Sequence, residues 1–126
     1  MMPSSETTLM VVEDEFLIAS SLEMILQDAG YEVLEPLSSL DEALAAVAVH
    51  TPDLALLDIN LSGHTVYPAA DLLAAKGVPF LFLSGCSEGE LPERFAGVTL
   101  LLKPFSPEGL LDAICRILAE RTAVVG

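Results

Sequence analysis

Five short apolar runs, each leading into a turn and then a helix-compatible stretch, constrain the fold of this chain more than any other feature. Four of them are apolar nearly throughout, as parallel strands covered on both faces by helices must be. One run is broken by Glu32 and fits an edge strand. Strands that alternate with helices over short connections imply right-handed crossovers and a single three-layer α/β sandwich. The predicted strands are Thr8–Val12, Tyr31–Leu34, Leu54–Leu57, Val78–Leu83 and Val98–Leu102.

Two stretches between these runs carry clear helix signals. Phe16–Ala29 repeats apolar residues at helical spacing, and Gly30 follows where a left-handed residue commonly ends a helix. Ser39 and Glu42 form a capping-box pattern before an alanine-rich stretch that continues to Val49. Both stretches are therefore predicted to be helices.

The remaining connections give weaker signals. A helix is predicted over Pro68–Lys76, with proline in its first turn, and a last helix is predicted to begin after Ser106. The stretch Ser87–Phe95 contains Gly89 and Pro92, so we expect a short or mobile segment there. The sequence reaches Gly126 soon after the last predicted helix, so we expect no output domain.

The charge of the chain excludes several classes of partner. Its 126 residues include 5 Lys and Arg against 19 Asp and Glu, a formal charge of -14, while 52% of the residues are hydrophobic. This surface would repel nucleic acid and anionic lipid, so we expect neither as a partner. Residues Met1 to Thr8 do not resemble a secretory signal, and we expect a cytoplasmic location.

Several reactive or polar residues have plain structural interpretations. Cys86 and Cys115 lack metal-ligand spacing and are expected to be reduced, partly buried thiols. His50 lies at a predicted helix end and His64 in a loop, so neither is expected to carry phosphate. Asp53 precedes a strand at the opposite edge of the sheet from the strand ends and is interpreted as a turn residue.

The residues that close the apolar runs are those able to do chemistry. In an open parallel sheet the functional crevice lies at the carboxyl ends of the strands, so these residues should meet at one edge. In chain order they are Glu13, Asp14 and Glu15, then Asp58, then Ser84 and Gly85, and finally Lys103 and Pro104.

This set of residue types predicts phosphoryl transfer supported by a metal ion. Carboxylates crowded into one crevice repel one another, and a hard divalent cation with oxygen ligands relieves the repulsion, which points to Mg²⁺. Asp58 is then the expected nucleophile, which forms an acyl phosphate on its carboxylate. Lys103 and Ser84 are expected to bind the phosphoryl oxygens, the first as a charge and the second as a donor.

The order of these motifs resembles the receiver domain of response regulators in two-component signalling. The resemblance covers about Thr8 to Arg121, so we expect a single receiver domain over 1–126 with its core at about 8–121. It implies a flavodoxin-like (βα)5 fold with a parallel five-stranded sheet in the order 2-1-3-4-5. It further implies a signalling protein rather than an enzyme with a separate substrate, although the domain takes part in its own Mg²⁺-dependent phosphoryl transfer and dephosphorylation.

Carried onto this sequence, the resemblance assigns a role to each site residue. Asp58 is implied as the phosphoacceptor, with Asp14 as a direct metal ligand and Glu13 acting through water. A backbone carbonyl ligand from Asn60 and phosphoryl contacts from Ser84 and Lys103 are also implied. A cis peptide is expected between Lys103 and Pro104. The implied partner is a sensor histidine kinase or a histidine phosphotransfer protein, and the downstream protein partner is not specified.

One stretch narrows the resemblance to a subgroup. Val66 to Leu72, followed by Val78 to Gly85, is similar to receivers with a Pro-Phe-x-Phe-Ala-Thr-Gly-Tyr signature, which are commonly single-domain partners of bacterial sensor histidine kinases. This sequence departs from the signature at Leu83, Ser84 and Cys86, and it has Leu100 where many receivers place a switching aromatic residue. We therefore hypothesise that phosphorylation is reported by reordering of residues 84–95.

Three alternative functions stay open at the level of sequence. A degenerate receiver would act as a phosphorylation-independent binding module, and the full set of site residues argues against it. A phosphatase similar to the haloacid dehalogenases would have a second acid where Asn60 stands. A nucleotide-binding domain would show a glycine-rich loop after the first strand, which this chain lacks. The preferred prediction is a stand-alone response regulator that signals by protein contact or phosphorelay.

Overall fold

The five apolar runs form one parallel sheet in a computed structural model that describes residues 7–85 and 91–125, with side chains to residue 120. Its order is β2-β1-β3-β6-β7, which confirms the predicted flavodoxin-like order 2-1-3-4-5. The run with Glu32 lies at one edge, as predicted, but its ladder is only two residues long. The strands are β1 (Thr8–Val12), β2 (Glu32–Val33), β3 (Leu54–Asp58), β6 (Phe80–Ser84) and β7 (Leu100–Leu102).

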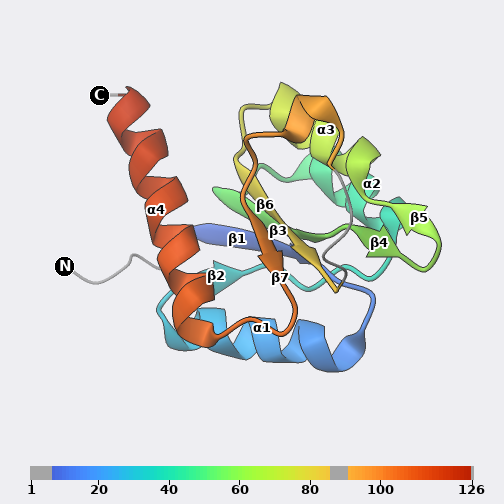
Figure 1. The fold of residues 1–126 in the computed structure, drawn as a ribbon, viewed down its shortest axis with the longest axis horizontal. Coiled ribbons are helices and arrows are strands. Elements are labelled where there is room, and N and C mark those ends of the chain that lie inside the picture. The colour runs from blue at the N-terminus through green and yellow to red at the C-terminus, as the bar shows by residue number, and fades with distance from the viewer. Residues whose placement is uncertain (1–6, 86–90, 126) are drawn as a thin grey trace.

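Helices cover both faces of this sheet, as Figure 1 shows. One face packs against α1 (Phe16–Asp28) and α4 (Pro107–Val125), and the other packs against α2 (Leu40–Val49) and α3 (Tyr67–Ala75). The sandwich therefore has the three layers that the sequence predicts.

The alternation of side chains along each strand divides the core into two clusters. In β1, Leu9 and Val11 pack with the α1 and α4 residues, whereas Met10 and Val12 pack with those of α2 and α3. All four are fully buried. Burial on both faces explains why the strands are apolar throughout instead of alternating with polar residues.

The predicted helix boundaries rest on the expected local contacts. Ser39 Oγ accepts a hydrogen bond from Glu42 N at 3.1 Å, while Glu42 Oε1 accepts one from Ser38 N at 2.8 Å. The capping box is therefore present, with its return bond displaced by one residue. Gly109 N donates to Ser106 Oγ at 2.9 Å at the start of α4, which confirms that cap.

One feature differs from the sequence prediction. A hairpin of β4 (Asn60–Leu61) and β5 (His64–Thr65) follows β3 directly, where no strand was predicted. The described part of the 87–95 segment contains a 3-10 turn, η1 (Glu93–Phe95), in agreement with the short segment expected there. The rest of that segment, together with Cys86, lies outside the described residues, so the reordering hypothesis stays a prediction.

The expectation of a buried Cys115 is wrong. Its side chain is exposed on α4, and its sulfur lies 3.7 Å from the hydroxyl of Tyr31. Leu110 and Ile114 lie on the buried face of α4. Cys115 is the next residue after Ile114 and therefore points away from that face.

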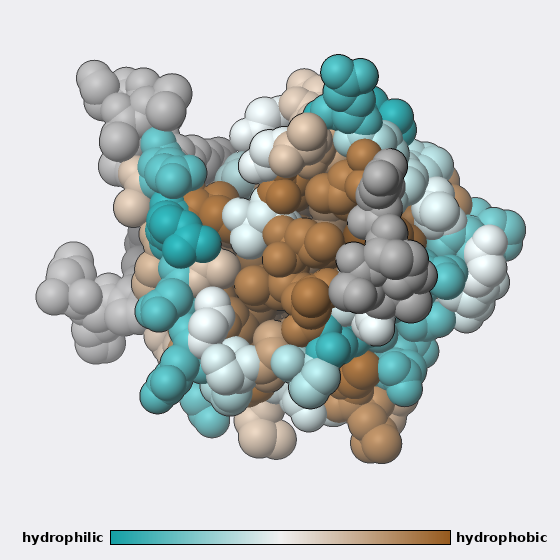
Figure 2. Space-filling model, viewed as in Figure 1, coloured by the Kyte–Doolittle hydropathy of each residue, from teal (hydrophilic) through white to brown (hydrophobic). Residues whose placement is uncertain are grey.

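An apolar surface surrounds the edge strand β7. Figure 2 shows apolar side chains gathered between α4 and α3, where β7 forms the edge of the sheet. Leu102 is 47% exposed, and Leu100 and Leu101 are only partly buried.

No helix within the described residues is long and apolar enough to cross a membrane.

The stability of the fold should depend on Phe82, which is fully buried and packs its ring against Tyr67, Phe80 and Phe95. Replacing Phe82 by alanine leaves a cavity in a close-packed core, so we expect a loss of about 3–5 kcal/mol in the free energy of unfolding. Urea unfolding followed by circular dichroism measures it. Phe16→Ala is the control, because Phe16 is 78% exposed and its removal should leave the unfolding midpoint nearly unchanged.

Candidate functional site

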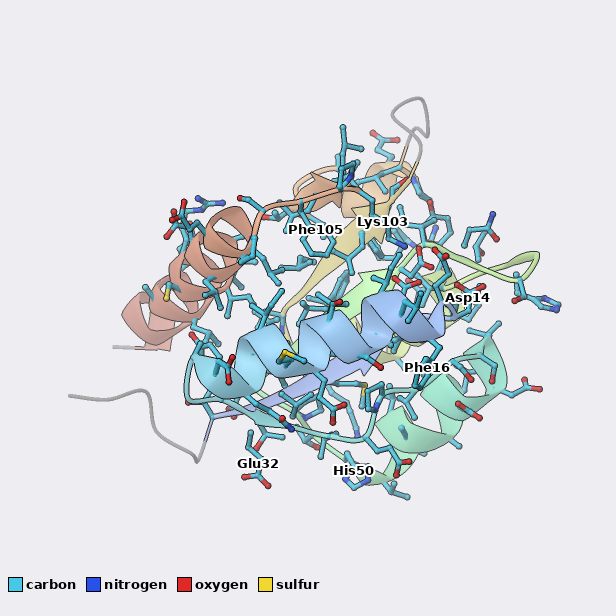
Figure 3. All side chains as sticks on the ribbon, turned by 90° about the horizontal axis from the view of Figure 1, so that it is seen from below. Asp14, Phe16, Glu32, His50, Lys103 and Phe105 are labelled. Carbon is cyan, nitrogen blue, oxygen red and sulfur yellow. The ribbon has the colours of Figure 1, made fainter. Side chains whose placement is uncertain are left out.

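The registers of the parallel strands bring the predicted site residues to one edge of the sheet. Val12 pairs with Leu57 and Ser84 with Leu102, so each strand ends at nearly the same level. Glu13, Asp58 and Lys103 therefore come together although 45 residues separate each from the next in the sequence. Figure 3 shows Asp14 and Lys103 at this end of the molecule and Glu32 far from it.

Lys103 is the cation at the centre of this edge. Its Nζ lies 2.8 Å from Glu13 Oε1 and 3.5 Å from Asp58 Oδ1. The Glu13 side chain is fully buried and that of Asp58 is 8% exposed, so both carboxylates depend on protein groups rather than water. The bond between Lys103 and Pro104 is cis, as the resemblance implies. One ammonium group thus serves two nearly buried acids.

The acidic groups outnumber this cation. Glu13, Asp14 and Asp58 each offer one oxygen, and these oxygens all lie within 4.8 Å of one another. Glu13 Oε2 accepts a hydrogen bond from Glu15 N at 3.1 Å. Glu13 Oε1 has no well-directed hydrogen bond among the described residues. Lys103 therefore interacts with this oxygen as a nearby positive charge.

This donor set fits a hard divalent cation. All the donors are carboxylate oxygens, which are the ligands that Mg²⁺ prefers. When all three acids are ionised, they carry two more negative charges than the single ammonium of Lys103 neutralises. A divalent cation would relieve the mutual repulsion of these acids and add positive charge beside Glu13 Oε1, whose one close cationic neighbour among the described residues is Lys103. Glu13, Asp14 and Asp58 are therefore the residues that could hold Mg²⁺.

The electrostatics of the site differ from one acid to the next. Burial raises the pKa of Asp58 to about 7, the charge of Glu13 adds to the rise, and Lys103 opposes it. Burial would also raise the pKa of Asp14, but hydrogen bonds from Ser62 and Asp58 hold it below its ordinary value. Burial would lower the pKa of Lys103, yet Glu13 and Asp58 together raise it above its ordinary value. Lys103 thus stays charged while Asp58 is held close to protonation.

A pocket of about 640 Å³ opens over these groups. Its lining includes Asp14, Asp58, Ser84 and Lys103, so the predicted nucleophile, hydroxyl and ammonium share one space. Asn60 also lines it, and its side-chain oxygen accepts a hydrogen bond from Gly63 N at 3.2 Å. The metal-binding role of the Asn60 carbonyl and the water-mediated role of Glu13 stay predictions.

The residues interpreted as structural lie elsewhere. Asp53 Oδ2 accepts a hydrogen bond from Thr8 N at 2.8 Å at the amino-terminal edge of the sheet, which confirms its turn role. His50 follows the end of α2, and His64 is exposed on β5.

Two residues near the site were missed from the sequence. Ser62 Oγ donates a hydrogen bond to Asp14 Oδ2 at 3.0 Å, and Tyr67 lines the pocket while packing on Phe82. The Ser62-Gly63 dipeptide is a turn signal that could have indicated the hairpin. No sequence signal indicates the position of Tyr67.

Comparison with known proteins agrees with this geometry. Residues 9–115 match the family model described as "Response regulator receiver domain". The transcriptional regulatory protein PdtaR of Mycobacterium tuberculosis is 32% identical over 109 residues, which are 83% of this chain and 53% of PdtaR. The phyllosphere-induced regulator PhyR of Methylorubrum extorquens is 34% identical over 119 residues, which are 89% of this chain and 43% of PhyR. The chain thus spans about half the length of these relatives.

Solved structures of similar size superpose closely. The solution structure of SdrG from Sphingomonas melonis Fr1 has a TM-score of 0.80 and 36% identity, covering 92% of this chain and 99% of that one. A CheY-like response regulator receiver domain protein from Methanospirillum hungatei JF-1 has a TM-score of 0.82 and 27% identity, covering 93% and 97%.

The crowding of acids predicts that Asp58→Asn stabilises the metal-free protein. The pKa of Asp58 rises from its ordinary 3.8 to about 7 on folding, so folding takes up a proton between these values, and stability falls as the pH rises through that window. At pH 8 in EDTA, where wild-type Asp58 is ionised, we expect the variant to gain on the order of 1–2 kcal/mol in urea unfolding. The gain should shrink toward pH 4.

Asp53→Asn is the matched control, since Asp53 directly precedes the strand that Asp58 ends. This variant should not be stabilised at pH 8, because Asp53 lies outside the acidic cluster. A destabilised Asp58→Asn protein at pH 8 would show that the acids do not repel one another as the geometry indicates.

Proposed function

Because this chain belongs to the response regulator receiver family, we propose that Asp58 accepts a phosphoryl group from a phosphohistidine of a sensor histidine kinase or histidine phosphotransfer protein. The chain then signals in the cytoplasm through protein contact or phosphorelay. The observation that carries this proposal is the position of Asp58, within 3.5 Å of the Lys103 ammonium and inside the acidic cluster of Glu13 and Asp14.

The transfer is a displacement at phosphorus. An oxygen of ionised Asp58 forms a bond to phosphorus as the bond from phosphorus to the histidine nitrogen breaks, and that nitrogen keeps the electron pair. Lys103 binds a phosphoryl oxygen as a charge, and the Ser84 hydroxyl donates a hydrogen bond to another. When bound, Mg²⁺ neutralises charge on the carboxylates and on the phosphoryl oxygens.

The surface beside the pocket supports docking of a protein donor. Phe16 and Leu17 are 78% and 77% exposed at the start of α1, directly after the acidic residues of the site. A groove of about 600 Å³ runs from Leu17 to Phe105 and includes Lys103. Figure 3 places Phe16 beside Asp14. An apolar helix face of the donor can cover these side chains while its phosphohistidine enters the pocket.

Phosphorylation itself is tested with a small donor. We expect wild-type protein incubated with acetyl phosphate and Mg²⁺ to gain the mass of one phosphoryl group, and Asp58→Asn to gain none, because an amide cannot form the acyl phosphate. Intact-protein mass spectrometry at neutral pH measures the gain. Asp53→Asn should be labelled like wild type, and labelling of Asp58→Asn to the wild-type extent would overturn the proposal.

Docking is tested by comparing two donors. Leu17→Ser should slow transfer from a phosphorylated histidine kinase of the same organism by about tenfold, since it removes one apolar anchor of the contact. Its labelling by acetyl phosphate should stay at the wild-type rate, because Leu17 does not line the phosphoacceptor pocket. Val49→Ser, at a side chain 75% exposed on α2, is the control and should affect neither donor. If Leu17→Ser and wild type accept the phosphoryl group from the kinase at equal rates, Leu17 is not part of the docking surface.

A further inference from the structure

Ser62 has a backbone conformation that serine rarely adopts. Its φ is 53°, the one positive φ of a non-glycine residue within 7–85 and 91–125. Gly63 follows with φ of 91°, and the two residues form the turn between β4 and β5. Two-residue hairpin turns with positive φ favour Asn, Asp and Gly, which enter this region with little strain. The local turn therefore gives no reason for a serine.

The side chain of Ser62 supplies a reason. Its hydroxyl donates to Asp14 Oδ2 at 3.0 Å across 48 positions of sequence. Asp14 is the most exposed of the three acids in the cluster, with Glu13 and Asp58 buried. Like charges within 4.8 Å push the free carboxylate toward water, and the hydrogen bond from Ser62 opposes that movement.

The hairpin holds the hydroxyl in a fixed place. Leu61, next to Ser62, is 1% exposed and packs in the core cluster of α2 and α3. Val66 N donates to Ile59 O at 2.8 Å, and Gly63 N donates to the Asn60 side chain at 3.2 Å. The hairpin begins at Asn60, two residues after Asp58. Ser62 is therefore linked to Asp58 through the short chain of the hairpin and to Asp14 through its hydroxyl.

We propose that Ser62 is a positioning residue for the metal site, which holds Asp14 beside Glu13 and Asp58 so that a divalent cation meets a preformed group of oxygens. The inference rests on the proposed function, because it takes Mg²⁺ as the ion of that site. The strained φ of Ser62 is the consequence of placing a hydroxyl at the turn position where glycine would fit better.

Two substitutions of Ser62 should change the affinity for Mg²⁺ and the thermal stability independently of each other. Ser62→Gly removes the hydroxyl and the strain together, so the dissociation constant for Mg²⁺ should rise about tenfold while the thermal midpoint in EDTA stays or rises. Ser62→Thr keeps the hydroxyl but puts a branched side chain at positive φ, so its affinity should stay near wild type while its midpoint falls. Amide chemical shifts followed through a MgCl₂ titration, with no phosphodonor present, give the dissociation constants.

Thr65→Ala is the matched control, because it removes an exposed hydroxyl from the other strand of the same hairpin. It should bind Mg²⁺ like wild type. The inference is overturned if Ser62→Gly binds Mg²⁺ as tightly as wild type, or if Thr65→Ala loses as much affinity. A wild-type protein that takes up no Mg²⁺ would remove the metal site from the proposed function, and this inference would fall with it.

Discussion

The site depends on one ammonium group placed between two nearly buried carboxylates. Lys103 lies within ion-pair distance of Glu13 and Asp58, and a third acid, Asp14, completes a cluster that the lysine cannot neutralise. Buried charges without full compensation are costly, so this arrangement favours any ligand that adds positive charge or exchanges a proton. A metal ion would add positive charge, and the raised pKa of Asp58 shows that this carboxylate takes up a proton readily.

The sheet makes this crowding possible. Burial of β1 and β3 on both faces fixes their registers, so Glu13 and Asp58 emerge at the same level without freedom to separate. The hairpin after Asp58 then reaches back to Asp14 through Ser62. The packing of the apolar layers thus stabilises a fold in which mutually repelling acidic groups are held close together.

The pocket is also connected to the 3-10 turn η1 through packed aromatic rings. Tyr67 lines the pocket and packs against Phe82 and Phe95, which places a ring cluster between Asp58 and the 3-10 turn η1. Arg94 on that turn pairs with Asp71 of α3 at 2.9 Å and lies over the Phe95 ring. Packed side chains therefore run from the acidic pocket to the turn η1, although Leu100 stands where many receivers have an aromatic residue.

The sequence by itself determined the positions of the main strands, both helix caps and the identity of the acids, hydroxyl and lysine at the strand ends, whereas the strand order was implied by the family resemblance. These follow from local periodicity, from caps such as Ser39, and from the rule that parallel strands present their carboxyl ends at one edge. The Pro-Phe-x-Phe-Ala-Thr-Gly-Tyr subgroup stays a prediction. Only the tertiary structure decided that Ser62 meets Asp14 and that Tyr67 enters the pocket. Those contacts join residues distant in sequence, and their geometry depends on how the layers pack rather than on any local pattern.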